Sequence, residues 1–314
     1  MDQTIIIGSG MAGISCARAL AEAGVTVRVL DKGRGIGGRM ATRRVSLPTG
    51  DLTFDHGAQY MRPRDAAFAQ ALAAAGSCTW PDGTDHSRHV GVPGMSSVPR
   101  AMAAGLNVAQ QTEVSAMTLR DGVWHLMTPA GELRARRVIL TIPAPQAARL
   151  LGPDHPFAQH LARVTMAPCL TLMAAFPPKS ARPFVQRRDP GHDLAWIAQD
   201  SAKPGRAETA VTWVAQAGPA FSRARLESST EDMTAPMLRS LAEVLGADPS
   251  HALHARVHRW RYAQASTALG QPFLRDDARS LFVGGDWCLG ARAEDAWHSG
   301  RAIAQNILDG ADVL

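Results

Sequence analysis

Three glycines near the start of the chain have the spacing of a phosphate-binding turn. Residues 8–13 match the pattern G-x-G-x-x-G, and an acidic residue, Asp31, follows 18 positions after Gly13. In this pattern the first glycine permits a tight strand-to-helix turn, and the second lets the backbone approach a pyrophosphate. The third lets the helix pack closely on the strand. A carboxylate at Asp31 can accept hydrogen bonds from a ribose diol, so the segment predicts a dinucleotide site.

A second motif follows the acidic residue at a fixed distance. Gly37-Gly38-Arg39 begins six positions after Asp31, and Thr42 lies three positions beyond Arg39. This arrangement resembles the FAD-containing amine-oxidase superfamily, whose members place GG-R-x-x-S/T at this spacing. The resemblance implies that Gly38 and Arg39 lie along the FAD pyrophosphate and the flavin edge, where a guanidinium suits the charge of a diphosphate.

Longer segments narrow the resemblance to the renalase family, specifically its bacterial branch. They span nearly the whole chain in the order expected for that family. The matching segments are FDHGAQY at 54–60, HVGVPGMS at 89–96, RWRYA at 259–263, GDWC at 285–288 and EDAWHSG at 294–300.

The resemblance and the glycine motif together assign site residues. Val114 should offer backbone groups to the adenine, and Asp286 should bind ribityl or phosphate oxygens. The last helix should point its N-terminus at the flavin N1–O2 edge, where reduced flavin carries negative charge. The expected FAD-binding residues are Gly8, Ser9, Gly10, Met11, Ala12, Gly13, Asp31, Lys32, Gly37, Gly38, Arg39, Gln59, Tyr60, Val114, Asp286, Asp295, Ala296 and Trp297. The expected substrate-lining residues are Gln59, Tyr60, Trp196, Arg261, Trp287 and Trp297.

Lysines are scarce in the part of the chain that should bind substrate. Classical amine oxidases of the superfamily carry a lysine there, linked to flavin N5 through water. Here that region has only Lys179 and Lys203, both in Pro- and Gly-rich contexts that predict exposed turns. We therefore expect no general base and assign no catalytic residue. The histidines and cysteines show no metal-ligand spacing, so we expect no metal site.

The elements that must position these residues follow from apolar periodicity. Residues 4–7, 11–23 and 25–30 read as strand, helix and strand, which form one βαβ unit. A hairpin is expected within 108–128, with its turn at Asp121-Gly122. Further helices are expected at 64–75, 231–245 and 295–308, and further strands at 137–142, 169–176, 194–198, 209–215, 255–260 and 280–283.

These elements predict an α/β fold with two discontinuous domains. A Rossmann-like FAD-binding domain should contain 1–62, 97–148 and 272–314. A substrate domain with a mostly antiparallel sheet should contain 63–96 and 149–271.

Composition excludes several classes of protein. Of the 314 residues 46% are apolar and 19% charged, which favours a packed core. The net charge is +5, but the basic clusters are not interleaved with aromatics, so we expect no nucleic-acid partner. No uncharged run has the length of a membrane span, and the N-terminus does not resemble a signal peptide. The four cysteines show no paired spacing, so we expect a cytoplasmic protein.

The sequence therefore predicts an FAD-dependent oxidoreductase that holds its cofactor non-covalently. The renalase resemblance implies oxidation of isomeric dihydronicotinamides, 2- or 6-dihydro-NAD(P), to NAD(P)+ by hydride transfer to flavin N5. Dioxygen would then be reduced to hydrogen peroxide. Two alternatives stay open: a flavin amine oxidase or desaturase acting on another small substrate, and a flavin-bound sensor or scaffold without turnover. The oligomeric state, the choice between NAD and NADP forms and the physiological electron acceptor are not predicted.

Overall fold

The chain forms two compact units, each built from segments distant in sequence. The computed structural model describes residues 1–48, 50–84 and 87–310. The first unit contains Met1–Gly38, Pro99–Met166 and Gln264–Leu314, and the second contains Arg39–Val98 and Ala167–Ala263.

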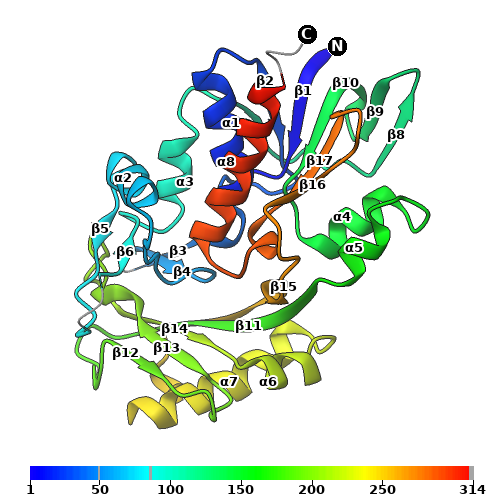
Figure 1. Cartoon of the computed structure of the whole chain (residues 1–314). Coiled ribbons are helices and arrows are strands. Elements are labelled where there is room, and N and C mark those ends of the chain that lie inside the picture. Colours follow the sequence, from blue (N-terminus) through cyan, green and yellow to red (C-terminus); the bar gives the residue numbers. More distant parts are fainter. Residues whose placement is uncertain (49, 85–86, 311–314) are drawn as a thin grey trace. The chain divides into compact units, whose positions relative to one another are not determined.

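An eight-stranded sheet is the centre of the first unit (Figure 1). Its order is β16-β17-β10-β1-β2-β7, and the hairpin β8–β9 joins it through β9. Neighbours among β17, β10, β1, β2 and β7 run parallel, whereas β16 and the hairpin are antiparallel. The strands are β1 (Asp2–Ile7), β2 (Val27–Leu30), β7 (Asn107–Ala109), β8 (Ala116–Arg120), β9 (Val123–Thr128), β10 (Gly131–Leu140), β16 (Phe273–Arg275) and β17 (Leu281–Gly284).

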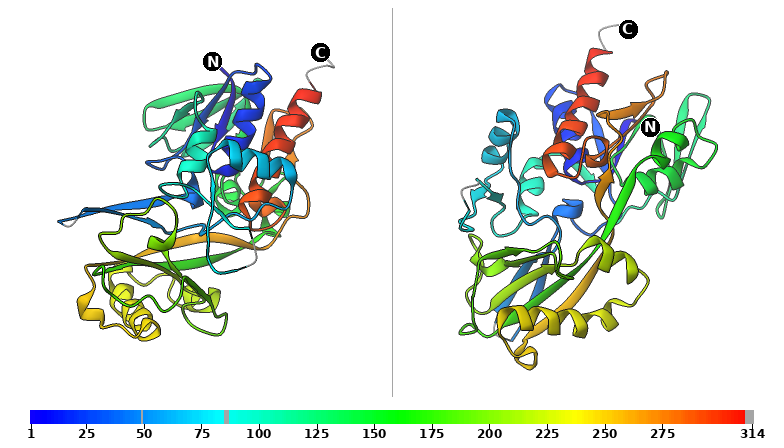
Figure 2. Two further views of the ribbon diagram at one scale, coloured as in Figure 1. Left: turned by 90° about the vertical axis from the view of Figure 1, so that its left-hand side faces the viewer. Right: turned by 60° about the horizontal axis from the view of Figure 1, so that its bottom comes forward.

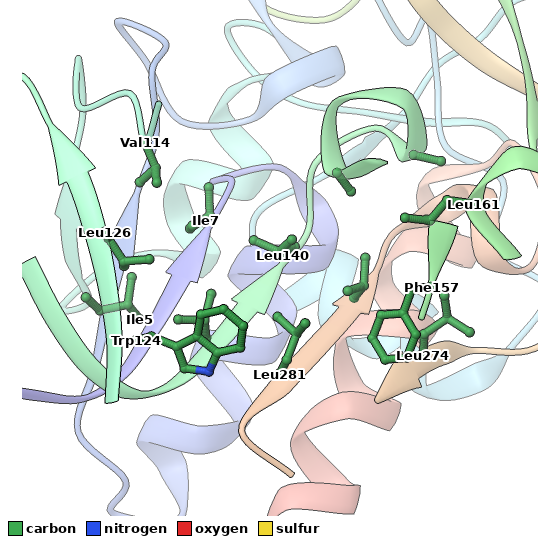
Figure 3. Packing of buried hydrophobic residues seen from close by; sticks show 14 of the residues in the cluster. Ile5, Ile7, Val114, Trp124, Leu126, Leu140, Phe157, Leu161, Leu274 and Leu281 are labelled. Carbon is green, nitrogen blue, oxygen red and sulfur yellow. The ribbon is translucent and has the colours of Figure 1, made fainter. Parts of the chain in front are cut away.

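Alternate residues of the central strands enter two different cores. Ile6 lies in the core beneath helices α1 (Met11–Glu22) and α8 (Ala293–Asp309), which pack side by side on one face. Ile5 and Ile7 point to the opposite face, where they pack with Trp124 and with α4 (Ala144–Leu151) and α5 (Ala158–Ala162) (Figure 3). Burial on both faces explains why these strands are continuous apolar runs.

The second unit is built on a five-stranded sheet of order β12-β13-β14-β11-β15. Helices α6 (Pro219–Ala224) and α7 (Thr230–Leu245) cover one face (Figure 2). The hairpin of β3 (Thr42–Leu47) and β4 (Gly50–Asp55) packs on the other face, through Leu52 and Phe54. The sheet strands are β11 (Thr165–Phe176), β12 (Gln186–Arg188), β13 (Trp196–Gln199), β14 (Val211–Gln216) and β15 (His254–Thr267). The unit also contains α2 (Ala66–Ala74), β5 (Cys78–Thr79) and β6 (His89–Val90), and the short helix α3 (Ser97–Met102) crosses the boundary between the units.

The predicted α/β fold is confirmed, with a Rossmann-like unit and a mostly antiparallel sheet. One prediction is wrong: the start of the expected hairpin segment 108–128 forms β7, which pairs in parallel with β2. The compact units also divide the chain elsewhere than the predicted functional domains. Residues 39–62 join the second unit because β4 packs against its sheet, and 149–166 join the first because Phe157 and Leu161 lie in its core.

Candidate functional site

The glycine turn between β1 and α1 has an open backbone surface. The Gly8 N–H donates to the Leu30 carbonyl at 2.8 Å, and Gly8 has a φ of +111°, which favours glycine. Gly10 is the N-cap residue of α1, and a Cβ built on it would meet no atom within 4 Å. The first turn of α1 holds no acidic side chain. A helix N-terminus of this kind binds phosphates through its free N–H groups, so this turn fits an FAD pyrophosphate.

Asp31 organises the same turn from the end of β2. One carboxylate oxygen accepts from the Ser9 N–H at 2.6 Å and from the Ser9 hydroxyl at 2.8 Å. The other accepts from the Gly33 N–H at 2.6 Å. The main chain of Asp31 also pairs with Ala109 and Thr112. Asp31 therefore shapes the turn, and its contact with a ribose stays a prediction.

The next predicted contacts lie along this loop. The Gly37 N–H donates to the Ser9 carbonyl at 3.0 Å, and Lys32 lies 3.7 Å from Glu113 as an exposed ion pair. Val114 is buried, but it lies just before β8 and not on the hairpin, where the sequence predicts it. Its segment nonetheless follows residues that hydrogen-bond to Asp31.

The last predicted cofactor segment spans the end of β17 and the start of α8. Asp286 is buried directly after β17, and the Gly285 N–H donates to the Ser299 hydroxyl at 2.9 Å. Asp295 accepts from the Arg292 N–H at 2.9 Å and so caps its own helix. The Trp297 carbonyl accepts from the Ser15 hydroxyl at 3.1 Å, which joins α8 to α1. The two helices that are predicted to face the cofactor are therefore held together.

Trp287 does not line a cavity, so its prediction as a substrate-lining residue is wrong. Its side chain is fully buried in the core of the first unit. The indole N–H donates to the Ile142 carbonyl at 3.0 Å. The tryptophan packs between elements of this unit, a role that a Trp in a Gly-Asp-Trp-Cys motif does not reveal.

In the second unit, the segment after β4 carries the predicted site residues Gln59 and Tyr60, and the predicted residue Arg39 is bonded to it. The Arg39 guanidinium donates to the Ala263 carbonyl at 3.1 Å, and the Arg39 carbonyl accepts from the Ala58 N–H at 2.8 Å. The Gln59 carboxamide nitrogen donates to the Gly57 carbonyl at 3.1 Å and also to the Asp55 carbonyl. Arg39, which precedes β3, is thus hydrogen-bonded to the segment that carries Gln59.

The structure places the aromatic rings of Tyr60 and Trp196 in contact. Their ring centroids are 5.8 Å apart, and both side chains are half-buried. The sequence reasoning did not identify Arg88, whose guanidinium carbon lies 4.4 Å from the Tyr60 centroid and 5.5 Å from that of Trp196. Asp82, itself buried, pairs with Arg88. A cation held over an aromatic face by a buried carboxylate stabilises the contact between these side chains.

Lys203 was predicted to lie in an exposed turn, and this is wrong. Its side chain is fully buried. Its ammonium nitrogen lies 3.1 Å from Asp55, 2.7 Å from Asp200 and 3.4 Å from the Gln59 carboxamide oxygen. Arg206 pairs with the same two carboxylates. The second lysine of this region, Lys179, is exposed as predicted.

The charge of the cluster is stable because the carboxyl of Asp55 stays ionised. Burial would raise the pKa of Asp55, but the positive charges of Lys203 and Arg206 outweigh it. Hydrogen bonds from the Met95 N–H and the Thr42 hydroxyl act in the same direction. The pKa of Asp55 is therefore held below its ordinary value.

Arg261 lies on the surface of the second unit and is already paired. Its guanidinium donates to both oxygens of Glu227, at 2.6 and 3.0 Å. A substrate phosphate would have to compete with Glu227 for this guanidinium.

Two histidines near this segment, the buried His56 and the half-buried His258, are weak bases. Burial, helped by His258 and Arg43, lowers the pKa of His56 to about 3. Burial, with the positive charges of Arg43 and Arg256, lowers the pKa of His258 to about 4. Both imidazoles are neutral at pH 7, but such low pKa values make them poor proton acceptors.

The part of the chain that the structure describes has neither a metal-ligand cluster nor a membrane-spanning helix. No three or more His, Cys, Asp or Glu side chains are grouped so that they could hold a metal ion. Within the same residues, no helix has the length and apolar character needed to cross a bilayer.

The fold and the glycine turn define a dinucleotide-binding oxidoreductase. A family model of the NAD(P)-binding Rossmann-like domain matches residues 6–74. The model of flavin containing amine oxidoreductase matches residues 80–308, more than half of the chain, and the chain belongs to that family. It is an FAD-dependent oxidoreductase, and FAD is its cofactor.

Solved structures of the same fold cover nearly the whole chain at low identity. The "Putative protoporphyrinogen oxidase" of Exiguobacterium sp. 255-15 is 14% identical, with a TM-score of 0.76 and 98% of each chain covered. Putrescine oxidase bound to putrescine is 16% identical, with a TM-score of 0.74, covering 98% of this chain and 99% of its own. Cyclohexylamine oxidase from Brevibacterium oxydans IH-35A is 15% identical, with a TM-score of 0.72 and 99% of each chain covered.

Proposed function

We propose that the protein oxidises an isomeric dihydronicotinamide, 2- or 6-dihydro-NAD(P), to NAD(P)+, with dioxygen as the final electron acceptor. The observation that carries this proposal is the state of Lys203. Its side chain is buried, and its nitrogen is engaged by Asp55, Asp200 and Gln59, so these partners hold it away from a role in proton transfer. His56 and His258 are too weakly basic to replace it.

A dihydronicotinamide suits a site without a general base. Its ring nitrogen carries no proton that must leave, and the loss of hydride restores aromaticity. The protein then needs only to position the flat ring and its nucleotide tail. Tyr60 and Trp196, with Arg88 against both rings, could flank such a ring. When bound, FAD supplies the hydride acceptor.

We propose that FAD is bound non-covalently by the FAD-binding residues predicted from the sequence. Gly10 leaves room for the pyrophosphate, Asp31 meets the ribose, and Arg39 supplies positive charge. The four cysteines are unpaired, which suits the cytoplasmic location that we propose. Cys288, the cysteine nearest to the predicted flavin residues in sequence, is buried, and its burial raises the pKa of the thiol to about 12. It therefore offers no thiolate for a covalent link.

An amine substrate is the second candidate, favoured by the name of the family and by the putrescine bound to a structural neighbour. An amine is protonated at neutral pH and must lose a proton before it can give up hydride. Lys203 does not serve this step, so we rank the amine second.

Rapid anaerobic mixing separates the two candidates. Oxidised protein is mixed with 2- and 6-dihydro-NAD(P), ordinary NAD(P)H and a panel of amines, and flavin absorbance is followed. We expect fast bleaching by the isomeric dihydronicotinamides and slow bleaching by the others. Fast bleaching by an amine alone would establish the second candidate, and no bleaching by any compound would favour a non-catalytic flavoprotein.

A further inference from the structure

Four charged side chains form a cluster inside the second unit, and its purpose is not obvious from the fold. Asp55, Asp200, Lys203 and Arg206 have side chains that are 0–1% exposed. Taking ions out of water is costly, and a buried ion pair often adds little net stability compared with apolar packing. Such a cluster is more readily explained by what it holds in place.

The cluster ends at the carboxamide of Gln59. The three N–H groups of the Lys203 ammonium have three acceptors within reach: Asp55, Asp200 and the Gln59 carboxamide oxygen. The carboxamide nitrogen donates to the carbonyls of Asp55 and Gly57. If the amide were rotated by half a turn, its nitrogen would face the ammonium and its oxygen would face two carbonyls. Only one orientation therefore lets both the nitrogen and the oxygen of this carboxamide meet suitable partners.

The chain on either side of Gln59 is anchored as well. The Trp260 indole N–H donates to the His56 carbonyl at 2.7 Å, and the Gln216 carboxamide donates to the Gly57 carbonyl, also at 2.7 Å. With the Asp55 carbonyl bonded to Gln59, three consecutive carbonyls are held. Tyr60 directly follows this segment.

We propose that Lys203 is a positioning residue: through the cluster with Asp55 and Asp200 it fixes the carboxamide of Gln59 and, with it, the segment that leads to Tyr60. The proposal rests on the proposed function in one respect, because it assumes that Gln59 and Tyr60 face the substrate. The ammonium acts through Gln59 and does not take part in proton transfer.

The test compares three changes and one control. Asp200→Asn/Lys203→Met removes one negative and one positive charge, which keeps the cluster balanced. Gln59→Leu removes the carboxamide but leaves the cluster. The third variant combines both changes, and Lys179→Met, at the exposed lysine, is the control. Should Asp200→Asn/Lys203→Met fail to fold, Asp200→Asn alone weakens the hold on the ammonium, and the same readouts apply.

The first readout needs no substrate. In protein labelled with 15N-glutamine, the side-chain signal of Gln59 is identified by its loss in Gln59→Leu. We expect its amide protons to exchange with solvent at least about tenfold faster in Asp200→Asn/Lys203→Met, and at the wild-type rate in Lys179→Met. An unchanged exchange rate would overturn the proposal, whatever the substrate proves to be.

The second readout is the limiting rate of flavin reduction by whichever compound bleaches the wild type fastest. We expect Gln59→Leu and Asp200→Asn/Lys203→Met each to lower it about tenfold or more, and the combined variant to be no slower than the slower of the two. FAD affinity, measured by flavin fluorescence, should change less than about threefold. Effects that multiply in the combined variant would show that Lys203 does not act through Gln59. A wild type that no candidate compound bleaches would refute the proposed function but not the exchange result.

Discussion

At the scale of single residues, the glycines of the phosphate-binding turn have different surroundings. A Cβ at Gly13 would lie 1.9 Å from the Gly8 carbonyl oxygen, whereas one at Gly10 would meet no atom within 4 Å. Gly10→Ala should therefore fold normally but place a methyl group where the pyrophosphate approaches the backbone. Gly13→Ala should separate the helix from the strand.

We expect Gly10→Ala to weaken FAD binding about tenfold or more, the loss of roughly one good contact, with a melting temperature near that of the wild type. Gly13→Ala should lower the melting temperature of the apoprotein by several degrees. Fluorescence titration measures the FAD affinity, and thermal unfolding measures the melting temperature. Gly35→Ala, another site where a Cβ meets open space, is the control. Full FAD affinity in Gly10→Ala would place the pyrophosphate elsewhere.

The low pKa values of His56 and His258 predict how the stability of the protein changes in acid. His56 and His258 are neutral in the folded state because their pKa values are lowered to about 3 and about 4. In the unfolded chain they gain protons below about pH 6.5. The unfolded state therefore binds more protons between pH 6.5 and 4, and stability falls as the pH falls through that window.

Between pH 6 and 4.5, we expect each of the two histidines to lower the free energy of unfolding by about 1 kcal/mol for every unit by which the pH falls. Urea unfolding at several pH values gives the slope. His258→Gln should make it shallower, while His160→Gln, at an exposed position on α5, should leave it unchanged. An identical slope in His258→Gln would show that this imidazole is not desolvated.

At the scale of elements, Gly300 sets the distance between α8 and α1. A Cβ there would lie 2.1 Å from the Ala12 carbonyl oxygen and 2.2 Å from the Ser15 hydroxyl. Because the N-terminus of α1 forms the phosphate-binding turn, forcing the helices apart should disturb stability and cofactor binding together.

Gly300→Val should therefore lower the melting temperature by several degrees and weaken FAD binding in the same variant. Overpacking of this kind costs about 1–3 kcal/mol. Gln305→Val adds the same side chain at an exposed position of α8 and should have little effect on either quantity. A Gly300→Val protein with normal stability and affinity would mean that the two helices can move apart freely.

The helices and strands differ in how far the sequence alone could predict them. Local apolar periodicity predicted the strands β1, β10 and β17 and the helices α1 and α8, because the buried residues of each element follow one another in a regular pattern. The hairpin β3–β4 was not, since its apolar residues are covered by strands more than a hundred positions away in the chain. Lys203 was misplaced for the same reason: its local sequence is that of a turn, and the carboxylate of Asp55 that buries it lies 148 positions away.

The candidate site was predictable to a similar degree. The turn at Gly10 and Asp31 follows from spacing alone, because each residue type has a fixed task there. The contacts among Tyr60, Trp196 and Arg88 join residues that are distant in the chain. No spacing could have indicated Arg88, and Trp287 was assigned to the wrong environment.

At the scale of the whole molecule, the first unit needs the end of the chain. Strand β10 pairs with β1 on one side and with β17 on the other, and α8 covers the face shared by Ile6 and Ile139. A protein shortened before β17 would lose one central strand and one covering helix. We expect truncation after Asp277 to give aggregated protein that binds no FAD, measured by sedimentation and flavin fluorescence. A monomeric, FAD-binding truncated protein would contradict this expectation.

Strand β17 pairs with β10 but follows it late in the chain, and this has a consequence during synthesis on the ribosome. About 140 residues pass between the completion of β10 at Leu140 and the arrival of β17 at Leu281. At typical elongation rates of about 5–20 residues per second, the growing chain spends roughly 7–30 seconds with the β17-facing edge of Val138–Leu140 unpaired, beyond the part of β10 that pairs with β9. An unpaired edge is a template for association with other chains. The nascent protein should therefore depend on chaperones more than its size suggests, and slowing translation within 141–280 should reduce its yield.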